Sequence, residues 1–218
     1  MLKVKAVIFD MDGLMIDTEP VGNMICVEAN QKFGYTVTQE MLFDLIGRNQ
    51  QSAKEYYFDV FGKDYQFEKV REEANRLREE YYANHDLKVK PGLYELLDYL
   101  KEQNIKMAVA SSTVSSRVLE NLKEIHVEQY FDCIIGGDMI THGKPAPDIF
   151  LKALDLLKVN HDEAVVLEDS KNGILASYLA SIPVICIPDL VKHTKDTLDK
   201  TYLVLESLDQ VIDYVEKM

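Results

Sequence analysis

The sequence predicts an α/β fold in which a doubly wound parallel sheet is interrupted by an inserted α-helical bundle. Short apolar runs rich in β-branched residues recur along the chain, and after residue 92 each run follows a segment with helical spacing. Strands that are apolar on both faces and alternate with helices are typical of a parallel sheet covered on both sides. Residues 18–86 contain helical patterns and no strand-like run, so they predict the insertion.

In chain order, the first expected strand covers residues 4–9 (VKAVIF), because this run is short, apolar and β-branched. In the inserted segment, Pro20 suits the start of a helix and Thr38 can cap a helix at 39–47. Further helices in this segment are expected at 52–62 and 67–84.

After Pro91-Gly92 the pattern becomes regular. The expected helices cover 93–103, 116–125, 147–158 and 172–180, and the strands that follow them cover 106–111, 131–137, 164–169 and 183–188. A strand at 202–205 and a helix at 207–217 complete the chain. We therefore expect a core domain of residues 1–16 and 88–218, with a helical cap domain of residues 17–87.

Composition limits the classes of partner. The 218 residues carry a net charge of −13, which argues against nucleic acid or an anionic membrane as the main partner. The expected ligand is a small molecule, and an anionic one would need a local positive site in this acidic chain. We expect neither a signal peptide nor a transmembrane segment of about 18 apolar residues. The cysteines have no metal-binding spacing and are expected to be reduced core residues of a cytoplasmic monomer (Cys26, Cys133, Cys186).

Polar residues gather at the carboxyl ends of four predicted strands, which is where ligands bind in open parallel sheets. The strand ends carry carboxylates, hydroxyls and one lysine: Asp10 and Asp12, Ser111 and Ser112, Lys144, and Glu168 and Asp169. Carboxylates this close repel one another unless a cation lies among them. Oxygen ligands without His or Cys nearby suit Mg²⁺, while Lys144 and Ser111 would face a substrate phosphate. Gly13 allows a sharp turn directly after the two aspartates.

Four motifs carry a family resemblance: DMDGLMIDTEP (10–20), VASST (109–113), GKPAPD (143–148) and VLEDSKNG (166–173). In this order and spacing they resemble those of the haloacid dehalogenase superfamily. The resemblance is closest to its β-phosphoglucomutase-like and sugar-phosphatase branch. It covers essentially the whole chain and implies a Rossmann-like core with a helical cap inserted after the first strand.

The resemblance also implies residue roles. Asp10 would be the nucleophile that accepts the phosphoryl group, and Asp12 would be the general acid and then the general base. The Mg²⁺ ligands would be Asp10, the backbone carbonyl of Asp12, and Asp169, with Glu168 as a possible further ligand. Ser111, Ser112 and Lys144 would bind the phosphate.

The cap is expected to select the substrate, and Glu19 and Arg48 are the candidate contacts, with Thr18 and Gly22 near the hinge. β-Phosphoglucomutases place a histidine where this chain has Gly22, so a phosphatase is favoured and a sugar-phosphate mutase of the β-phosphoglucomutase type is the alternative. The expected reaction is Mg²⁺-dependent hydrolysis of a sugar phosphate or nucleoside monophosphate through an aspartyl phosphate. A non-catalytic phosphoprotein-binding module is disfavoured by the intact set of site residues.

Two further expectations concern residues outside these motifs. The charged stretch REEANRLREEYY (71–82) is expected to form a solvated helix face. The five histidines share no ligand spacing and are expected on the surface or in loops.

Overall fold

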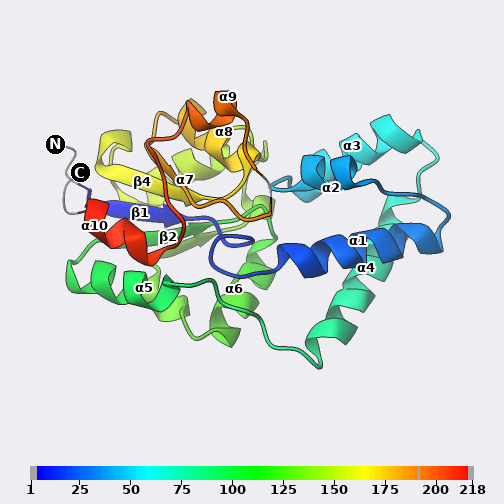
Figure 1. Ribbon diagram of the computed structural model, residues 1–218, viewed down its shortest axis with the longest axis horizontal. Helices are drawn as coiled ribbons and strands as arrows, with labels where there is room; N and C mark the ends of the chain where they lie inside the picture. The colour runs from blue at the N-terminus through cyan, green and yellow to red at the C-terminus, as the bar shows by residue number, and fades with distance from the viewer. Residues whose placement is uncertain (1–3, 191, 216–218) are drawn as a thin grey trace.

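The computed structural model describes residues 4–190 and 192–215. Six parallel strands form one sheet in the order β3-β2-β1-β4-β5-β6, with helices on both faces (Figure 1). The strands are β1 (Ala6–Phe9), β2 (Lys106–Ala110), β3 (Cys133–Ile135), β4 (Ala164–Glu168), β5 (Val184–Cys186) and β6 (Leu203–Val204). The predicted Rossmann-like α/β class is confirmed.

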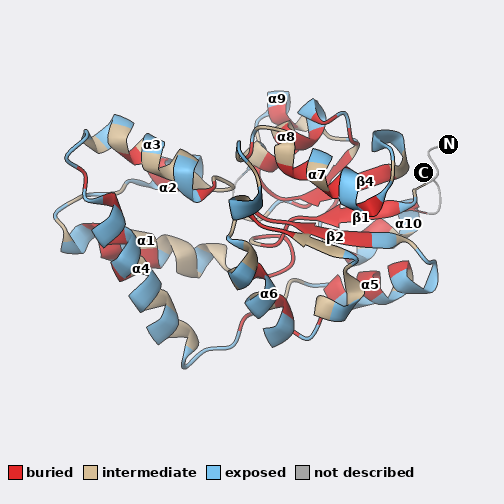
Figure 2. Ribbon diagram, turned by 180° about the vertical axis from the view of Figure 1, so that it is seen from behind, coloured by how far each residue is buried: buried red, intermediate tan, exposed pale blue. Residues whose placement is uncertain are grey.

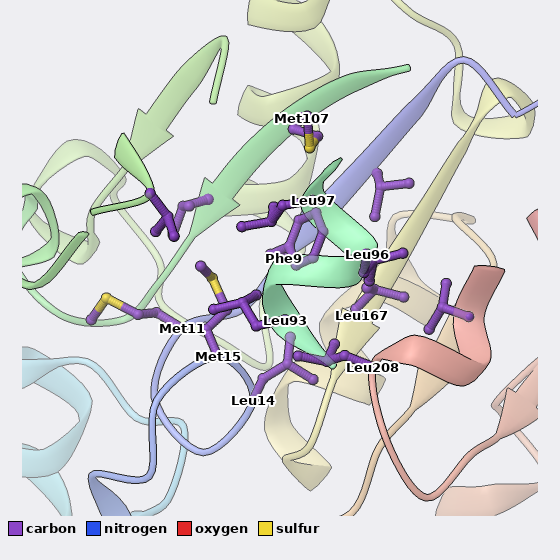
Figure 3. Close-up of a cluster of buried hydrophobic side chains, with 14 of the residues drawn as sticks. Phe9, Met11, Leu14, Met15, Leu93, Leu96, Leu97, Met107, Leu167 and Leu208 are labelled. Carbon is purple, nitrogen blue, oxygen red and sulfur yellow. The ribbon is translucent and has the colours of Figure 1, made fainter. Parts of the chain in front are cut away.

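The central strand β1 is buried on both faces because successive side chains point to opposite sides of a strand. Val7 and Phe9 pack on one face with helices α5 (Leu93–Glu102) and α6 (Ser115–Glu124). Figure 3 shows Phe9 of this cluster beside Leu97 and Met107. Ala6 and Ile8 pack on the other face with α7 (Asp148–Leu157) and α8 (Lys171–Leu179). Figure 2 shows the resulting buried centre of the sheet.

The segment between β1 and α5 forms four helices that lie together beyond one end of the sheet (Figure 1). They are α1 (Glu19–Lys32), α2 (Gln39–Leu45), α3 (Gln50–Phe61) and α4 (Phe67–Tyr82). These helices have an apolar core of their own, to which Tyr57 and Tyr65 contribute stacked rings. Thr38 accepts a hydrogen bond from the backbone N–H of Met41 and caps α2 as expected. The division into a core of 1–16 and 88–218 and a cap of 17–87 stays a prediction.

Several elements are shorter than the sequence indicated. β3 covers only the middle of the expected strand 131–137, because the Asp132 carboxylate accepts the N–H of Met107 and ends the ladder on one side. The helix expected at 207–217 is a 3₁₀ turn (Asp209–Val211) followed by α10 (Ile212–Val215), and residues 216–217 lie outside the described residues. The short helix α9 (Lys195–Leu198) lies beside α8.

The three cysteines are free; Cys186 is buried, and the other two are half-buried. Within the described ranges, no helix is both long and apolar enough to cross a membrane.

Candidate active site

The candidate site lies where the strand order reverses, beside the carboxyl ends of β1 and β4. β1 pairs with β2 on one side and with β4 on the other, which is the switch point at which open α/β sheets bind ligands. Phe9 lies opposite Leu167 in the register, and the N–H of Asp10 donates to the carbonyl of Leu167 at 3.0 Å. The ladder therefore brings Asp10 and Glu168 to the same edge of the sheet.

A buried lysine joins these two carboxylates. Lys144 is 1% exposed, and its Nζ donates to Oδ1 of Asp10 and to Oε1 of Glu168, each at 2.6 Å. The other oxygen of Glu168 accepts hydrogen bonds from the backbone N–H and the hydroxyl of Ser170, both at 2.9 Å. Both oxygens of Glu168 are therefore already engaged, and this side chain holds Lys144 in place.

Three carboxylates converge beside this lysine in an arrangement that fits a divalent cation. Asp10, Glu168 and Asp169 each offer one oxygen, and these atoms lie within 4.8 Å of one another. Oδ1 of Asp169 is buried and has no hydrogen-bond partner among the described residues. Burial, together with the neighbouring Glu168 and Asp10, raises the pKa of Asp169 well above its ordinary value. A cation bound by these oxygens would satisfy the unpartnered atom and offset the repulsion.

Asp10 shares this electrostatic environment. Burial raises its pKa to about 8, although the ammonium of Lys144 acts in the opposite direction. Neighbouring Glu168 and Asp12 raise it further. A positive charge at the carboxylate cluster would favour the ionised form of Asp10, which is the nucleophilic form.

Asp12 is held by hydroxyl groups from the hinge and from the loop after β2. Thr18 donates to its Oδ1 at 2.7 Å, while Thr113 at 2.9 Å and Ser111 at 3.4 Å donate to Oδ2. The Thr18 contact connects Asp12 to the residue that directly precedes α1. The two aspartates of the first motif thus have different environments, one buried among charges and the other bound by neutral donors.

The cap contacts the core around this site. The hydroxyl of Ser112 donates to the carbonyl of Gly47 at 2.9 Å, and the side-chain amide of Asn172 donates to the carbonyl of Ile46 at 2.8 Å. These bonds hold the loop between α2 and α3 over the core. Ser112 was expected to bind phosphate, and its hydroxyl hydrogen is used on the cap in this arrangement.

A cavity of about 290 Å³ lies between the cap loop and the strand ends. Its lining includes Asp10, Asp12, Ser111 and Asp169 from the core, and Glu19, Gly22 and Arg48 from the cap. Burial raises the pKa of Glu19 to about 7, and neighbouring Asp12 and Asp189 add to this shift. The structure thus brings five of the predicted core residues (Asp10, Asp12, Ser111, Ser112, Asp169) and both cap candidates to one cavity. The other two, Lys144 and Glu168, are buried and do not line it.

The sequence matches a known family over most of its length. A family model described as haloacid dehalogenase-like hydrolase matches residues 7–187. The chain belongs to the haloacid dehalogenase-like hydrolase family.

Similar members of this family include two phosphatases and a mutase. The chain is 32% identical over 179 residues to the phosphorylated carbohydrates phosphatase of Thermotoga maritima, and the match covers 82% of each chain. It is 29% identical over 195 residues to (DL)-glycerol-3-phosphatase 2 of Arabidopsis thaliana, covering 84% of this chain and 79% of the relative. The solved β-phosphoglucomutase of Clostridium difficile has a TM-score of 0.84 at 26% identity, covering 98% of this chain and 96% of that one.

Three side chains of this protein lie at the candidate site although the sequence analysis did not propose them as site residues. Thr113 binds Asp12, Arg78 lines the cavity from α4, and Nε2 of His193 lies 2.6 Å from the backbone carbonyl of Asp169. Thr113 is the last residue of the motif VASST (109–113), which was an available signal. Arg78 belongs to the stretch expected to be solvated, and that expectation is wrong for this residue because α4 turns it toward the core.

Proposed function

We propose that this protein is a Mg²⁺-dependent phosphatase that hydrolyses a small sugar phosphate or nucleoside monophosphate through an aspartyl phosphate. The observation that carries the proposal is the buried group of Asp10, Lys144 and Asp169, in which Asp169 has one unpartnered carboxylate oxygen. Relatives named for a phosphorylated carbohydrate and for glycerol 3-phosphate support a small phosphorylated substrate.

Asp10 is placed to attack phosphorus. Its Oδ1 is fixed by Lys144, which leaves Oδ2 without a bond to the lysine, and its backbone is tied to β4. In the first step, a carboxylate oxygen of Asp10 forms a bond to phosphorus, and the bond to the leaving oxygen breaks. Holding the nucleophile on a rigid strand end lowers the entropic cost of reaching this geometry.

Asp12 is assigned the proton transfers. In the first step it donates a proton to the leaving oxygen. In the second step it accepts a proton from the water that attacks phosphorus, while the bond between phosphorus and the Asp10 oxygen breaks and the Asp10 carboxylate is regenerated. General acid–base catalysis of this kind contributes about 10²–10⁴-fold. The hydroxyls of Thr18 and Thr113 keep the carboxylate in one orientation for both steps.

A bound Mg²⁺ would supply charge neutralisation for the phosphoryl group. Asp10 and Asp169 would hold it through side-chain oxygens, and Asp12 through its backbone carbonyl. Glu168, whose oxygens already accept from Lys144 and Ser170, would act chiefly by positioning Lys144. Ser111 and Lys144 would contact the phosphate.

Gly22 favours a phosphatase over the mutase alternative. It lies on α1 at the cavity wall. Apart from its chain neighbours and the backbone of its own helix, no atom of the described residues lies within 4 Å of the position its Cβ would take. Nothing at this point of the helix restrains a water molecule from approaching the aspartyl phosphate. A cytoplasmic location and a monomeric state stay predictions.

The test is Mg²⁺-dependent release of phosphate from p-nitrophenyl phosphate by wild type and by Asp10→Asn. We expect turnover to be abolished in the variant and in wild type treated with EDTA. Asp59→Asn, an exposed change of the same kind on α3, is the matched control and should retain activity. Full activity of Asp10→Asn would end the covalent mechanism. Interconversion of β-glucose 1-phosphate and glucose 6-phosphate that outruns phosphate release would favour the mutase.

A further inference from the structure

The cavity that contains Asp10 has two chemically different sides. The core side is formed by carboxylates and hydroxyl groups from the loops that follow β1, β2 and β4. A leaving group that extends from Asp10 into the cap meets a different surface, which we call the apolar wall. It consists of six residues from α1, α2, α3 and the loop between α2 and α3 (Cys26, Leu42, Leu45, Ile46, Ala53, Tyr57).

The polar side-chain atoms of the apolar wall are paired with each other. The hydroxyl of Tyr57 and Sγ of Cys26 share a hydrogen bond at 3.0 Å. Leu45, Ile46 and Ala53 are only half-buried, so they keep apolar surface toward the cavity. A bare sugar placed against this wall would leave hydroxyl groups without partners, which costs binding free energy. An apolar part of a ligand would gain from the same contact.

Helix α1 gives the order of side chains along the cavity. It begins at Glu19, directly after Thr18, whose hydroxyl binds Asp12, and it runs from the core out into the cap (Figure 1). Glu19, Asn23 and Cys26 all line the cavity, and their spacing of four and three residues places them on one face of the helix. At 1.5 Å per residue, Asn23 is about 6 Å and Cys26 about 10 Å further along the helix than Glu19. The apolar wall is therefore separated from the catalytic aspartates by room for a linker such as a pentose.

Asn23 is a polar group without a partner beside the apolar wall. It is half-buried, and its side-chain amide makes no hydrogen bond with any residue in the described part of the chain. An asparagine amide presents a donor and an acceptor side by side. The edge of a nucleobase presents the matching acceptor and donor, as in the bidentate pairing of asparagine with adenine. Asn23 thus offers hydrogen bonds to the edge of a ring whose faces are apolar.

The size of the cavity favours a compact ligand. Its volume of about 290 Å³ is at the lower end of the range for small-molecule sites, which is roughly 300–1,000 Å³. The bonds from Ser112 to Gly47 and from Asn172 to Ile46 hold the cap loop over this space. A closed cavity of this size suits a phosphate, a pentose and one planar ring system, and it excludes an oligosaccharide or a long acyl chain.

We propose that the apolar wall and Asn23 bind the nucleobase of the substrate, so that nucleoside monophosphates are preferred to sugar phosphates. This inference rests on the proposed phosphatase function and names its substrate class. The phosphate lies at Asp10, and the pentose passes Glu19. The base packs against Leu45 and Ala53 while its edge bonds to the amide of Asn23.

The test compares substrates that differ only in the base. Methyl β-ribofuranoside 5-phosphate, which has a methoxy group in place of the base, is compared with the 5′-monophosphates of uridine, cytidine, adenosine and guanosine. We expect kcat/KM to be at least about tenfold higher for one or more of the nucleotides, because the ring is removed from water against the apolar wall.

Two variants test the residues that carry the inference. Asn23→Leu should lower the ratio of the two kcat/KM values about tenfold, because the base edge loses both of its hydrogen bonds. Gln31→Leu is a similar change at an exposed position of the same helix and should leave the ratio unchanged. Ala53→Leu fills space at the apolar wall and should also lower the ratio, whereas Ala83→Leu, at the exposed end of α4, should not.

Binding is measured separately in an Asp10→Asn background, which removes turnover. Titration calorimetry with Mg²⁺ present should show tighter binding of the preferred nucleotide than of methyl β-ribofuranoside 5-phosphate, and Asn23→Leu should remove most of the difference. Equal binding of the two, or an equal effect of Gln31→Leu, would overturn the inference.

A higher kcat/KM for 2-phenylethyl phosphate than for every nucleotide would also overturn it, since that leaving group is apolar but has no hydrogen-bonding edge. Mg²⁺-dependent hydrolysis of p-nitrophenyl phosphate, which has no nucleobase, tests the phosphatase proposal independently.

Discussion

Gly13 and Asp169 are packed so closely that a Cβ at position 13 would stand 2.4 Å from Oδ2 of Asp169. Gly13 also has a φ of +84°, which L-residues with a side chain rarely adopt. The positive φ of Gly13 concerns only the turn after the two aspartates. The close approach to Asp169 ties that turn to a carboxylate from the other half of the chain.

We expect Gly13→Ala to displace the Asp169 carboxylate and to lower kcat on the order of 100-fold, because small displacements of reacting groups have effects of this size. The affinity for Mg²⁺ should fall as well, measured by calorimetry on the variant. Gly34→Ala is the matched control, since Gly34 has a φ of +83° and, its chain neighbours aside, no atom of the described residues lies within 4 Å of its Cβ position. Both variants should lose about 1–2 kcal/mol of stability from backbone strain. Equal Mg²⁺ affinity in the two variants would contradict the proposed role of Asp169.

Lys144 should contribute to stability as well as to catalysis. Lys144→Met leaves Asp10 and Glu168 buried without their cation, and removing one partner of such a group costs about 3–5 kcal/mol. Urea denaturation at pH 7 in the absence of Mg²⁺ measures the free energy of unfolding. Lys195→Met, at a side chain that is 86% exposed, should cost less than about 1 kcal/mol.

Adding Glu168→Gln to Lys144→Met should recover part of the lost stability, because one uncompensated carboxylate is removed. If Lys144→Met unfolds at the same urea concentration as wild type, the buried ion group does not stabilise the fold.

The stabilising effect of Mg²⁺ should depend on pH. In the metal-free folded protein the pKa of Asp10 is raised to about 8, chiefly by burial, from an ordinary value of 3.8. The folded state therefore binds more protons than the unfolded chain between these values, and the free energy of unfolding falls as the pH rises through this window. Mg²⁺ needs ionised ligands, so its binding releases protons, and its stabilising effect grows toward pH 8.

Thermal unfolding with and without Mg²⁺ at pH 5.5, 7 and 8 measures this dependence, and calorimetry in buffers of different ionisation enthalpy counts the protons released. Asp169→Asn should lose most of the stabilisation at every pH. A Mg²⁺-induced shift in Tm that is the same at all three pH values would contradict the raised pKa values.

The sequence was sufficient to predict the parallel sheet and the strand ends whose residues meet at the candidate site. The strands were predictable because each is apolar on both faces, and their carboxyl ends had to meet at one edge once the sheet was parallel. Strand lengths were less predictable, because the ends depend on partners distant in sequence. β3 begins only after Asp132, whose carboxylate takes the N–H of Met107 in β2.

The cap surface was the part that the sequence could not place. The pattern of residues 71–82 is charged on several sides, so periodicity alone could not separate Arg76, which pairs with glutamates of its own helix, from Arg78, which faces the site. That difference depends on how α4 packs against α1, which the charge pattern of α4 alone does not determine. His193 came to Asp169 for a similar reason, because the loop after β5 folds back over β4.

The bonds between the cap loop and the core should control closure of the site. Asn172→Ala removes the donor to the carbonyl of Ile46, which should raise KM several-fold and cost only about 1 kcal/mol of stability. Deuterium uptake at residues 46–49 should become faster in the variant. Asn84→Ala removes a comparable side-chain bond that lies wholly within residues 80–84, and it should leave both quantities unchanged. Unchanged deuterium uptake in Asn172→Ala would show that this bond does not hold the cap.

Two helix-interior glycines should respond to alanine with opposite signs. Gly22 in α1 has open space at its Cβ position, so Gly22→Ala should raise the free energy of unfolding by about 0.5–1 kcal/mol through the better helix propensity of alanine. A Cβ at Gly173 in α8 would stand 1.7 Å from Oε1 of Glu168, so Gly173→Ala should destabilise the protein and disturb Lys144. Urea denaturation compares the two variants directly, and a loss of stability in Gly22→Ala would show that the helix is not free to accept a side chain there. If Gly22→Ala is more stable but turns over bulky substrates more slowly than p-nitrophenyl phosphate, the glycine is explained by the room that it leaves for the leaving group.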